Sequence, residues 1–266
     1  MTLARRHMLT GYLGVAVIAG AIACSEVGTA PGGVVSLEFP AVVSPSIVYG
    51  DTLRDTLGAV IPLRAIAFDA SGRPIENAPI VYLSLDSISR VRFVAGPDIL
   101  VSDTVNTGDT LRTRTARVQA RVGSLQLQRT FTVVPRPDLL ELTSDARPRV
   151  ILRAADTSLT ITARLRHVAS ARDTQPVPSF LVRFAIEHRP PGADSVVVFT
   201  EGRRGGGFDT TGADGVASRS LRIRRGLLPD AADSIVVIVS AIYRPDRPIA
   251  GSPRRVVIVL ERSPAR

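Results

Sequence analysis

The histidines are the first residues to consider, because imidazole is the commonest general base and metal ligand in proteins. His7 lies near the N-terminus, His167 follows Arg166, and His188 precedes a Pro pair. The last two histidines have no second His, Cys or acid at metal-ligand spacing. The sequence contains no Gly-x-Ser-x-Gly motif, and Ser-x-x-Lys is impossible because all 33 basic residues are Arg. We therefore expect surface or loop histidines, no catalytic residue and no enzyme activity.

Acidic and glycine-rich segments offer two further possible binding sites. Asp209 and Asp214, with the distant Asp69, could supply oxygens to Ca²⁺, but calcium takes about six to eight oxygen ligands, and turn formation already explains these acids. The run Arg203–Gly207 could cradle a phosphate, yet it lacks the Gly-Lys-Ser/Thr ending and a following helix. A hairpin tip explains it better. We expect no metal site and no cofactor.

Cys24 is the only cysteine of the chain, so it cannot form an internal disulfide. It follows a segment with a basic start, Arg5 and Arg6, and an apolar run, Gly11–Ala23. That run is shorter than the roughly 20 apolar residues of a membrane-spanning helix, which is typical of a signal-peptide core. Residues 1–23 are therefore predicted to be a signal peptide.

The sequence Ala21-Ile22-Ala23-Cys24 resembles the lipobox of bacterial lipoproteins, although Ala21 stands where Leu is usual. The resemblance implies cleavage before Cys24 and its acylation, and several acyl chains at ~0.8 kcal/mol per buried CH₂ give a lasting membrane anchor. Ordinary signal peptidase cleavage after Ala23, with simple secretion, is the alternative. Ser25 is not the Asp that often retains such lipoproteins in the inner membrane, so the outer membrane is the expected location.

Beyond the anchor, the composition is that of a β-protein with an uneven positive charge. Residues 24–33 are small, polar and rich in Pro and Gly, which predicts a flexible tether. Residues 24–136 carry 11 Arg against 10 acids, and residues 137–266 carry 20 against 14, so the net charges are +1 and +6. The basic half could meet an anionic partner, or its Arg could simply solubilise the strands. Because aromatic and basic residues are not interleaved, we expect no nucleic-acid partner.

Apolar runs at regular spacing predict strands in both halves. From Thr115 to Val122, Ala and Val alternate with polar residues, which is typical of a half-buried strand. Pro135-Arg136-Pro137 ends the pairing because Pro lacks an N–H, so we place a domain boundary after residue 136. The strands predicted before it are Val34–Phe39, Ile61–Phe68, Ile80–Leu85, Ile99–Val105, Leu111–Val122 and Leu125–Val134. Those predicted after it are Arg149–Leu152, Leu159–Leu165, Phe180–Glu187, Val196–Thr200, Val216–Arg224, Ser234–Tyr243 and Arg255–Leu260.

The two halves also share a short pattern. Pro74 and Pro176 are each followed by apolar residues at offsets of one, six and eight positions. The last two residues of each set, which end at Tyr82 and Phe184, lie two apart and so on one face of a strand. The shared pattern favours a tandem repeat.

Two turn sequences resemble bacterial Ig-like domains of the invasin/intimin type. Asp209–Ser218 (DTTGADGVAS) is similar to their T-D-A-D-G-x-A segment, with Gly212 where Asp is frequent, and Ala67–Ile75 (AFDASGRPI) is similar to their D-x-x-G-x-P-V turn. In such turns Asp accepts backbone N–H groups and Gly adopts positive φ. The resemblance implies an all-β fold of two immunoglobulin-like β-sandwiches, residues 34–136 and 137–266, without an active site.

Two apolar runs depart from strand alternation. Ile235–Val239 and Val256–Leu260 are apolar on both faces, whereas a sandwich strand normally turns one face to water. Their outer faces must be buried as central strands, or covered by a loop, the other domain or a partner.

These features together predict a cell-envelope protein, lipid-anchored at Cys24, that serves as a surface spacer, adhesion or protein-interaction module. A second hypothesis is an accessory protein that binds an anionic envelope polymer or glycan through its Arg-rich second half. A hydrolase with an unfamiliar site is a third, and it would need an acidic or His-lined cleft.

Overall fold

The computed structural model describes nine segments of the chain: 33–40, 44–86, 91–94, 99–102, 113–152, 156–190, 197–200, 207–224 and 233–262. Within them the chain forms strands and turns and no helix, which confirms the all-β prediction. The predicted leader and Cys24 lie outside these segments. In the segments that are described, no helix has the length and apolar character needed to span a bilayer.

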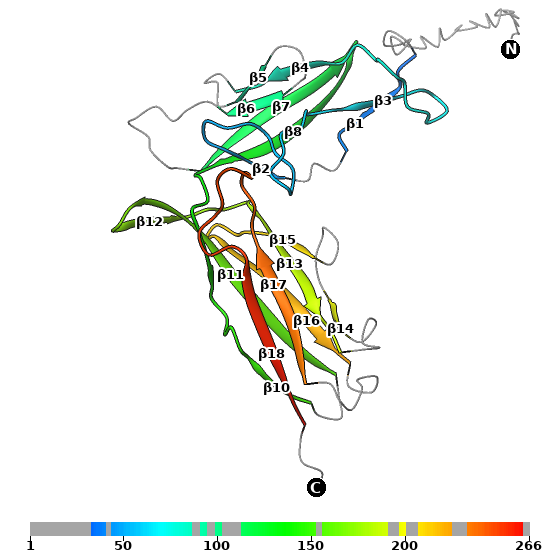
Figure 1. The fold of residues 1–266 in the computed structure, drawn as a ribbon. Helices are drawn as coiled ribbons and strands as arrows, with labels where there is room; N and C mark the ends of the chain where they lie inside the picture. The colour runs from blue at the N-terminus through cyan, green and yellow to red at the C-terminus, as the bar shows by residue number, and fades with distance from the viewer. Residues whose placement is uncertain are drawn as a thin grey trace, which may run out of the picture.

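The N-terminal half contains a central sheet and two strand pairs (Figure 1). Its strands are β1 (Ser36–Glu38), β2 (Ser46–Val48), β3 (Ile66–Phe68), β4 (Val81–Ser84), β5 (Val91–Val94), β6 (Ile99–Ser102), β7 (Arg114–Val122) and β8 (Leu125–Val134). The four-stranded sheet has the order β2-β8-β7-β4, and the pairs are β1-β3 and β5-β6. The hairpin of β7 and β8 around Gly123-Ser124 is the one predicted from alternation.

The C-terminal half is a sandwich of two sheets. Its strands are β9 (Leu139–Leu142), β10 (Arg149–Leu152), β11 (Thr157–Ser170), β12 (Asp173–Pro176), β13 (Leu181–His188), β14 (Val197–Phe199), β15 (Phe208–Thr210), β16 (Val216–Ile223), β17 (Ser234–Ser240) and β18 (Arg254–Arg262). One sheet has the order β10-β18-β17-β13-β15, and the other has the order β12-β11-β16-β14 with β9 also paired to β11. Buried Val, Ile, Leu and Phe side chains fill the space between them.

One plan of strand pairing occurs in both halves. The order β2-β8-β7-β4 corresponds to β10-β18-β17-β13, and in each case the first strand pairs with the last strand of its half in parallel. The pairs β1-β3 and β5-β6 correspond to β9-β11 and β14-β16. This division of strands between two sheets is that of the immunoglobulin fold. Tyr82 and Phe184, which end the repeated Pro pattern, lie on the equivalent strands β4 and β13.

The two apolar runs are neighbouring strands in the larger sheet of the sandwich. Ile235, Val237 and Val239 of β17 are completely buried in the core. The outer face of β17 is covered as well, because Val236 is only 4% exposed and lies opposite Val257 of β18. Burial within the sheet therefore explains most of this apolar surface.

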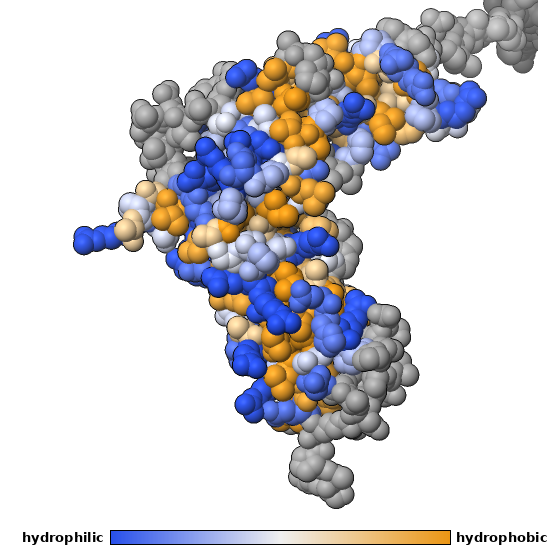
Figure 2. Space-filling model, viewed as in Figure 1, coloured by the Kyte–Doolittle hydropathy of each residue, from blue (hydrophilic) through white to orange (hydrophobic). Residues whose placement is uncertain are grey.

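Ion pairs border the same outer face. Arg255 lies 3.4 Å from Glu187, and Arg149 lies 2.9 Å from Glu261. Figure 2 shows hydrophilic residues between the apolar ones along the C-terminal half in this view. Charged side chains beside a β-rich apolar strip oppose edge-to-edge aggregation.

Five short strands were not predicted from the sequence: β2, β5, β9, β12 and β15. Each has three or four residues, too few for alternation to stand out. Four of them pair with a longer strand, as β9 and β12 do with β11, whereas β5 pairs with the equally short β6. The predicted boundary after residue 136 stays a prediction.

The turn sequences act as their residue types indicate. The Asp69 carboxylate accepts the backbone N–H groups of Ser71 and Arg73, and that of Asp214 accepts the N–H of Val216. Gly215 has a φ of +76°, and an added Cβ would lie 2.6 Å from the backbone oxygen of Leu165. Gly215 is thus required both by its conformation and by the close approach of β11.

Gly215→Ala tests this requirement against Gly72→Ala. Gly72 has a similar φ of +73° but no heavy atom within 4 Å of an added Cβ. We expect Gly72→Ala to lower the free energy of unfolding by about 1–2 kcal/mol from left-handed strain, and Gly215→Ala to cost about 1–3 kcal/mol more from the clash. Denaturant unfolding measures both. Equal losses of unfolding free energy for the two variants would mean that β11 moves away from the added Cβ without a measurable cost, and would contradict this requirement.

Candidate functional site at the junction of the two halves

An ion pair is buried where the halves meet. Arg54 donates from Nε and Nη2 to the two carboxylate oxygens of Asp51, both at 2.9 Å, and from Nη1 to the backbone oxygen of Gly58 at 2.7 Å. The Arg54 and Asp51 side chains are only 16% and 8% exposed. Two parallel N–H bonds to a carboxylate are the strongest geometry for such a pair.

Tyr243 connects this pair to the C-terminal half. Burial alone raises the pKa of Asp51, but hydrogen bonds from Arg54, Tyr243 and the Thr52 backbone outweigh it and lower the pKa to about 2. Burial also raises the pKa of Tyr243, and its hydrogen bond to the Asp51 carboxylate adds to this, giving about 12. Tyr243 therefore donates its O–H to a carboxylate that stays ionised.

Backbone and apolar contacts complete the junction. An added Cβ on Gly58 would lie 2.9 Å from the backbone oxygen of Tyr243, so the two backbone segments are in direct contact. Val48 and Val134, from β2 and β8, belong to the buried core of the C-terminal half. Their neighbour Val133 belongs to the core of the N-terminal half. Successive residues of β8 thus enter two different cores.

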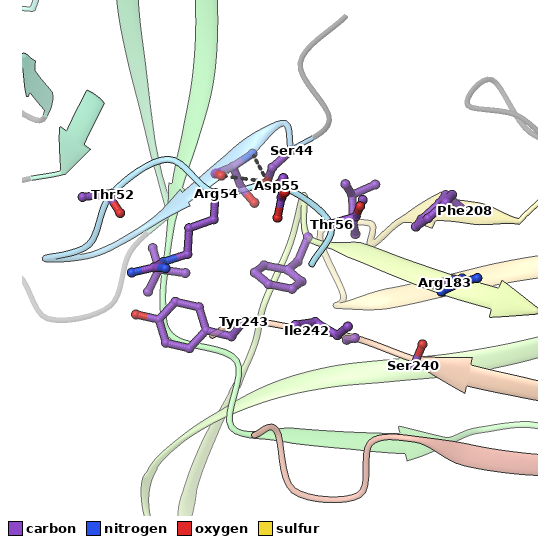
Figure 3. Close-up of a pocket in the computed structure, with 15 residues that line it drawn as sticks. Ser44, Thr52, Arg54, Asp55, Thr56, Arg183, Phe208, Ser240, Ile242 and Tyr243 are labelled. Atoms are coloured by element: carbon purple, nitrogen blue, oxygen red, sulfur yellow. Dashed lines mark hydrogen bonds between the residues drawn. The ribbon is translucent and has the colours of Figure 1, made fainter. Parts of the chain in front are cut away.

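We call residues 48–58 and 240–245, with their contacts, the junction. Between them lies a cavity of about 40 Å³, which is room for a few waters at about 10–15 Å³ each. Figure 3 shows Arg54 and Asp55 on one side of it and Ile242 and Tyr243 on the other, with the Arg54 side chain extending toward the Tyr243 ring. This cavity is too small for an organic ligand.

A larger depression lies beside the junction, and we call it the hollow. Its two adjoining parts have volumes of about 480 and 260 Å³ and share Arg136, Tyr243 and Arg247. The hollow is lined by Val48, Tyr49, Gly50, Pro135, Arg136, Pro137, Asp138, His167, Tyr243, Arg244, Arg247 and Pro248. It therefore takes residues from both halves and from the connection between them.

Asp138 organises the base of the hollow. Its Oδ1 accepts Arg136 Nε at 2.5 Å, and its Oδ2 accepts the backbone N–H of Val168 at 3.0 Å. His167 Nδ1 lies 2.7 Å from Oδ2 and 2.9 Å from the backbone oxygen of Arg136. Both of these are acceptors, so His167 donates from Nδ1.

The expectation of a surface or loop histidine is therefore wrong for His167. Its side chain is 13% exposed within β11, and Asp138 is its partner. The partner precedes β9, which pairs with β11, so only strand pairing brings the two together. His188, at the exposed end of β13, agrees with the expectation.

The other predicted candidates have local partners or lie outside the described residues. Asp209 Oδ2 accepts the backbone N–H of Ser218, and the carboxylates of Asp69 and Asp214 accept N–H groups of their own turns. Among the described segments, no three His, Cys, Asp or Glu side chains form a group that could hold a metal ion. Most of Arg203–Gly207 is not described, and neither is Cys24.

The Asp51 pair predicts an acid-sensitive stability. The pKa of Asp51 is about 2 in the folded chain against the ordinary 3.8, so its stabilisation is complete above pH 4 and lost as the pH falls toward 2. The difference in unfolding free energy between the natural chain and Asp51→Asn should shrink by about 2 kcal/mol over that range. Chemical denaturation from pH 7 to 2 measures it.

Asp246→Asn is the control, because the Asp246 side chain is 61% exposed in its pair with Arg244. The hydrogen bond from Arg244 also lowers the pKa of Asp246, but solvent screens this exposed pair, so the Asp246→Asn difference should shrink less in acid than the Asp51→Asn difference. Equal changes for the two variants would contradict a special role of the buried pair.

Comparisons with known proteins identify no family for this chain. No protein-family model and no curated protein matches the chain. S-layer protein SbsC domains 4 and 5 match with 13% identity and a TM-score of 0.30, covering 86% of this chain and 98% of that chain. Human protocadherin-24 EC1-2 matches with 14% identity and a TM-score of 0.28, covering 87% and 100%.

A glycoside hydrolase family 107 endo-fucoidan hydrolase, MfFcnA9, matches with 11% identity and a TM-score of 0.35 over 85% of this chain. This chain spans 34% of that hydrolase. These identities and TM-scores are too low to carry a function from any of the three proteins to this chain.

Proposed function

We propose that this chain is a non-catalytic lipoprotein of the bacterial cell envelope, anchored at Cys24, that acts as a stiff surface spacer and protein-interaction module. The observation that carries the proposal is the buried junction between the two halves. Domains joined only by a flexible linker move independently. Here the hydrogen bond from Tyr243 to the buried Asp51 carboxylate joins the two halves, and Val48 and Val134 of the N-terminal half pack into the C-terminal core.

The arrangement of the chain ends supports a spacer. In Figure 1, β1 lies at the end of the N-terminal half away from the junction, and β18 runs to the opposite end of the molecule. A lipid at Cys24 would therefore hold one end near a membrane and present the C-terminal half at a distance.

The second candidate function is binding of an anionic envelope polymer or glycan. The +6 net charge of residues 137–266 favours it, against +1 for residues 24–136. Three Arg side chains of this half and of the connection before it line the hollow. The two functions are compatible, since a spacer can also hold the molecule to a surface polymer.

Cys24→Ser tests the anchor. The full-length precursor should move from the membrane fraction to the soluble fraction, because no thiol remains to be acylated. Membrane fractionation and the mass of the mature N-terminal peptide are the measurements. Ser25→Ala, which keeps the thiol, should leave the chain in the membrane. A natural chain with an unmodified Cys24 would point to plain secretion instead.

Gly58→Val tests the stiffness of the junction. In a Cys24→Ser chain, spin labels at Ser124→Cys and Ala146→Cys report the distance between the two halves. We expect one narrow distance distribution, which Gly58→Val should broaden because its side chain meets the backbone of Tyr243. Gly72→Val has similar backbone strain with open space around it, and should leave the distribution narrow. A broad distribution before any junction substitution would contradict a stiff spacer.

A further inference from the structure

Of the three guanidinium groups of the hollow, those of Arg136 and Arg244 are held by carboxylates, and that of Arg247 is exposed. Arg136 is held through Nε by Asp138. A guanidinium has five N–H donors, so the donors on its two terminal nitrogens remain beyond that bond. Arg244 is held by Asp246 through Nε and Nη2, both at 3.0 Å. Arg247 is exposed at the end of the same turn, which its backbone N–H closes onto Arg244.

His167 adds a fourth polar group of a different kind. Its Nδ1 is used by Asp138 and the Arg136 backbone, so Nε2 is the ring nitrogen available to a molecule in the hollow. The carboxylate that orients His167 also orients Arg136. A donor set fixed in this way loses little side-chain entropy when it binds.

The local charge limits the kind of anion that fits. Arg136, Arg244 and Arg247 give three positive charges, and the carboxylates of Asp138 and Asp246 remove two, so the formal balance is +1. The Asp51–Arg54 pair behind Tyr243 is neutral as a unit. A nucleic-acid backbone with a charge on every residue needs a denser cationic surface. A polymer with single, widely spaced acidic groups does not.

The apolar side chains of the hollow indicate what the uncharged part of the ligand is. Tyr49 and Pro248 present apolar surface beside the guanidiniums, and the buried Tyr243 and Pro135 lie behind them. Aromatic rings combine an apolar body with a polar tip and pack against amphipathic molecules. Sugar rings are such molecules, with an apolar face of C–H groups.

We propose that the hollow binds an acidic glycan, with Arg136 and Arg247 holding the carboxylate or phosphate of one sugar and the accessible surfaces of Tyr49 and Pro248 packing against its ring. The site contains Tyr49 and Gly50 of the N-terminal half as well as the Arg-rich half, so it depends on the junction. This proposal rests on the second candidate function, the binding of an anionic polymer or glycan, and locates that binding in the hollow.

The test uses the full chain purified in detergent and titration calorimetry with three probes. A hyaluronan hexasaccharide carries a carboxylate on alternate sugars, a mannose hexasaccharide with one 6-phosphate carries a single phosphate, and maltohexaose is neutral. We expect one of the acidic probes to bind in a salt-sensitive way and maltohexaose to bind much more weakly. Whichever acidic probe binds identifies the anionic group. Failure of both acidic probes, or equal binding of maltohexaose, would overturn the proposal.

Substitutions locate the site. Arg136→Gln with Arg247→Gln should weaken binding about tenfold or more, because charge-assisted hydrogen bonds are lost. Arg149→Gln with Arg255→Gln is the matched control: it removes the same two charges from exposed pairs with Glu261 and Glu187 outside the hollow and should not change affinity. Equal weakening by both would show general charge attraction and overturn the site.

Two controls keep the result interpretable. Arg247→Gln alone changes an exposed side chain and should weaken binding even if Arg136→Gln disturbs the fold, which thermal unfolding would reveal. Displacement of the glycan by a short DNA duplex at equal charge concentration would overturn the choice of ligand. Because binding is measured on purified protein, its failure would leave the anchor and the stiffness of the spacer untouched.

Discussion

The hydrogen bond from Tyr243 to the buried Asp51–Arg54 pair is the contact on which the arrangement of the two halves depends. Taking two charges out of water is costly, and the cost is offset only if each charge keeps its partners in good geometry. Here Arg54 binds both oxygens of Asp51 and also Gly58, while Tyr243 donates to Asp51 from the other half. Rotation at the junction would remove the Tyr243 donor from the buried Asp51 carboxylate and leave the Tyr243 hydroxyl without this acceptor. This hydrogen bond therefore favours one relative orientation.

The apolar part of the junction follows from strand alternation. Adjacent side chains of a strand point to opposite faces, so Val133 enters the N-terminal core while Val134 enters the C-terminal one. Ile47 and Val48 of β2 are divided between the cores in the same way. The sheet β2-β8-β7-β4 thus provides one wall for two cores at its junction end. The hollow forms beside that wall, which is why it contains residues from both halves.

The sequence predicted the long strands well and the candidate site poorly. β8 and β10 have the predicted bounds, and the turns at Asp69 and Asp214 form with the predicted hydrogen bonds. His167 was misplaced because its partner, Asp138, is distant in sequence and reaches it only through the pairing of β9 with β11. Asp138 directly follows Pro137 and precedes β9, and this was the one local signal in the sequence. It does not identify His167 as the partner until the register of β9 against β11 is known.

The sequence by itself determined the strands, the turns and the cysteine available for a lipid. These depend on residue type and short spacing: branched and alternating apolar residues fit a pleated sheet, and Asp with Gly closes a tight turn. Tertiary structure decided the five short strands, the burial of both faces of β17, the Asp51–Arg54–Tyr243 contact and the hollow. Each of these joins residues far apart in the chain, and local propensity contains no information on which distant segments will meet.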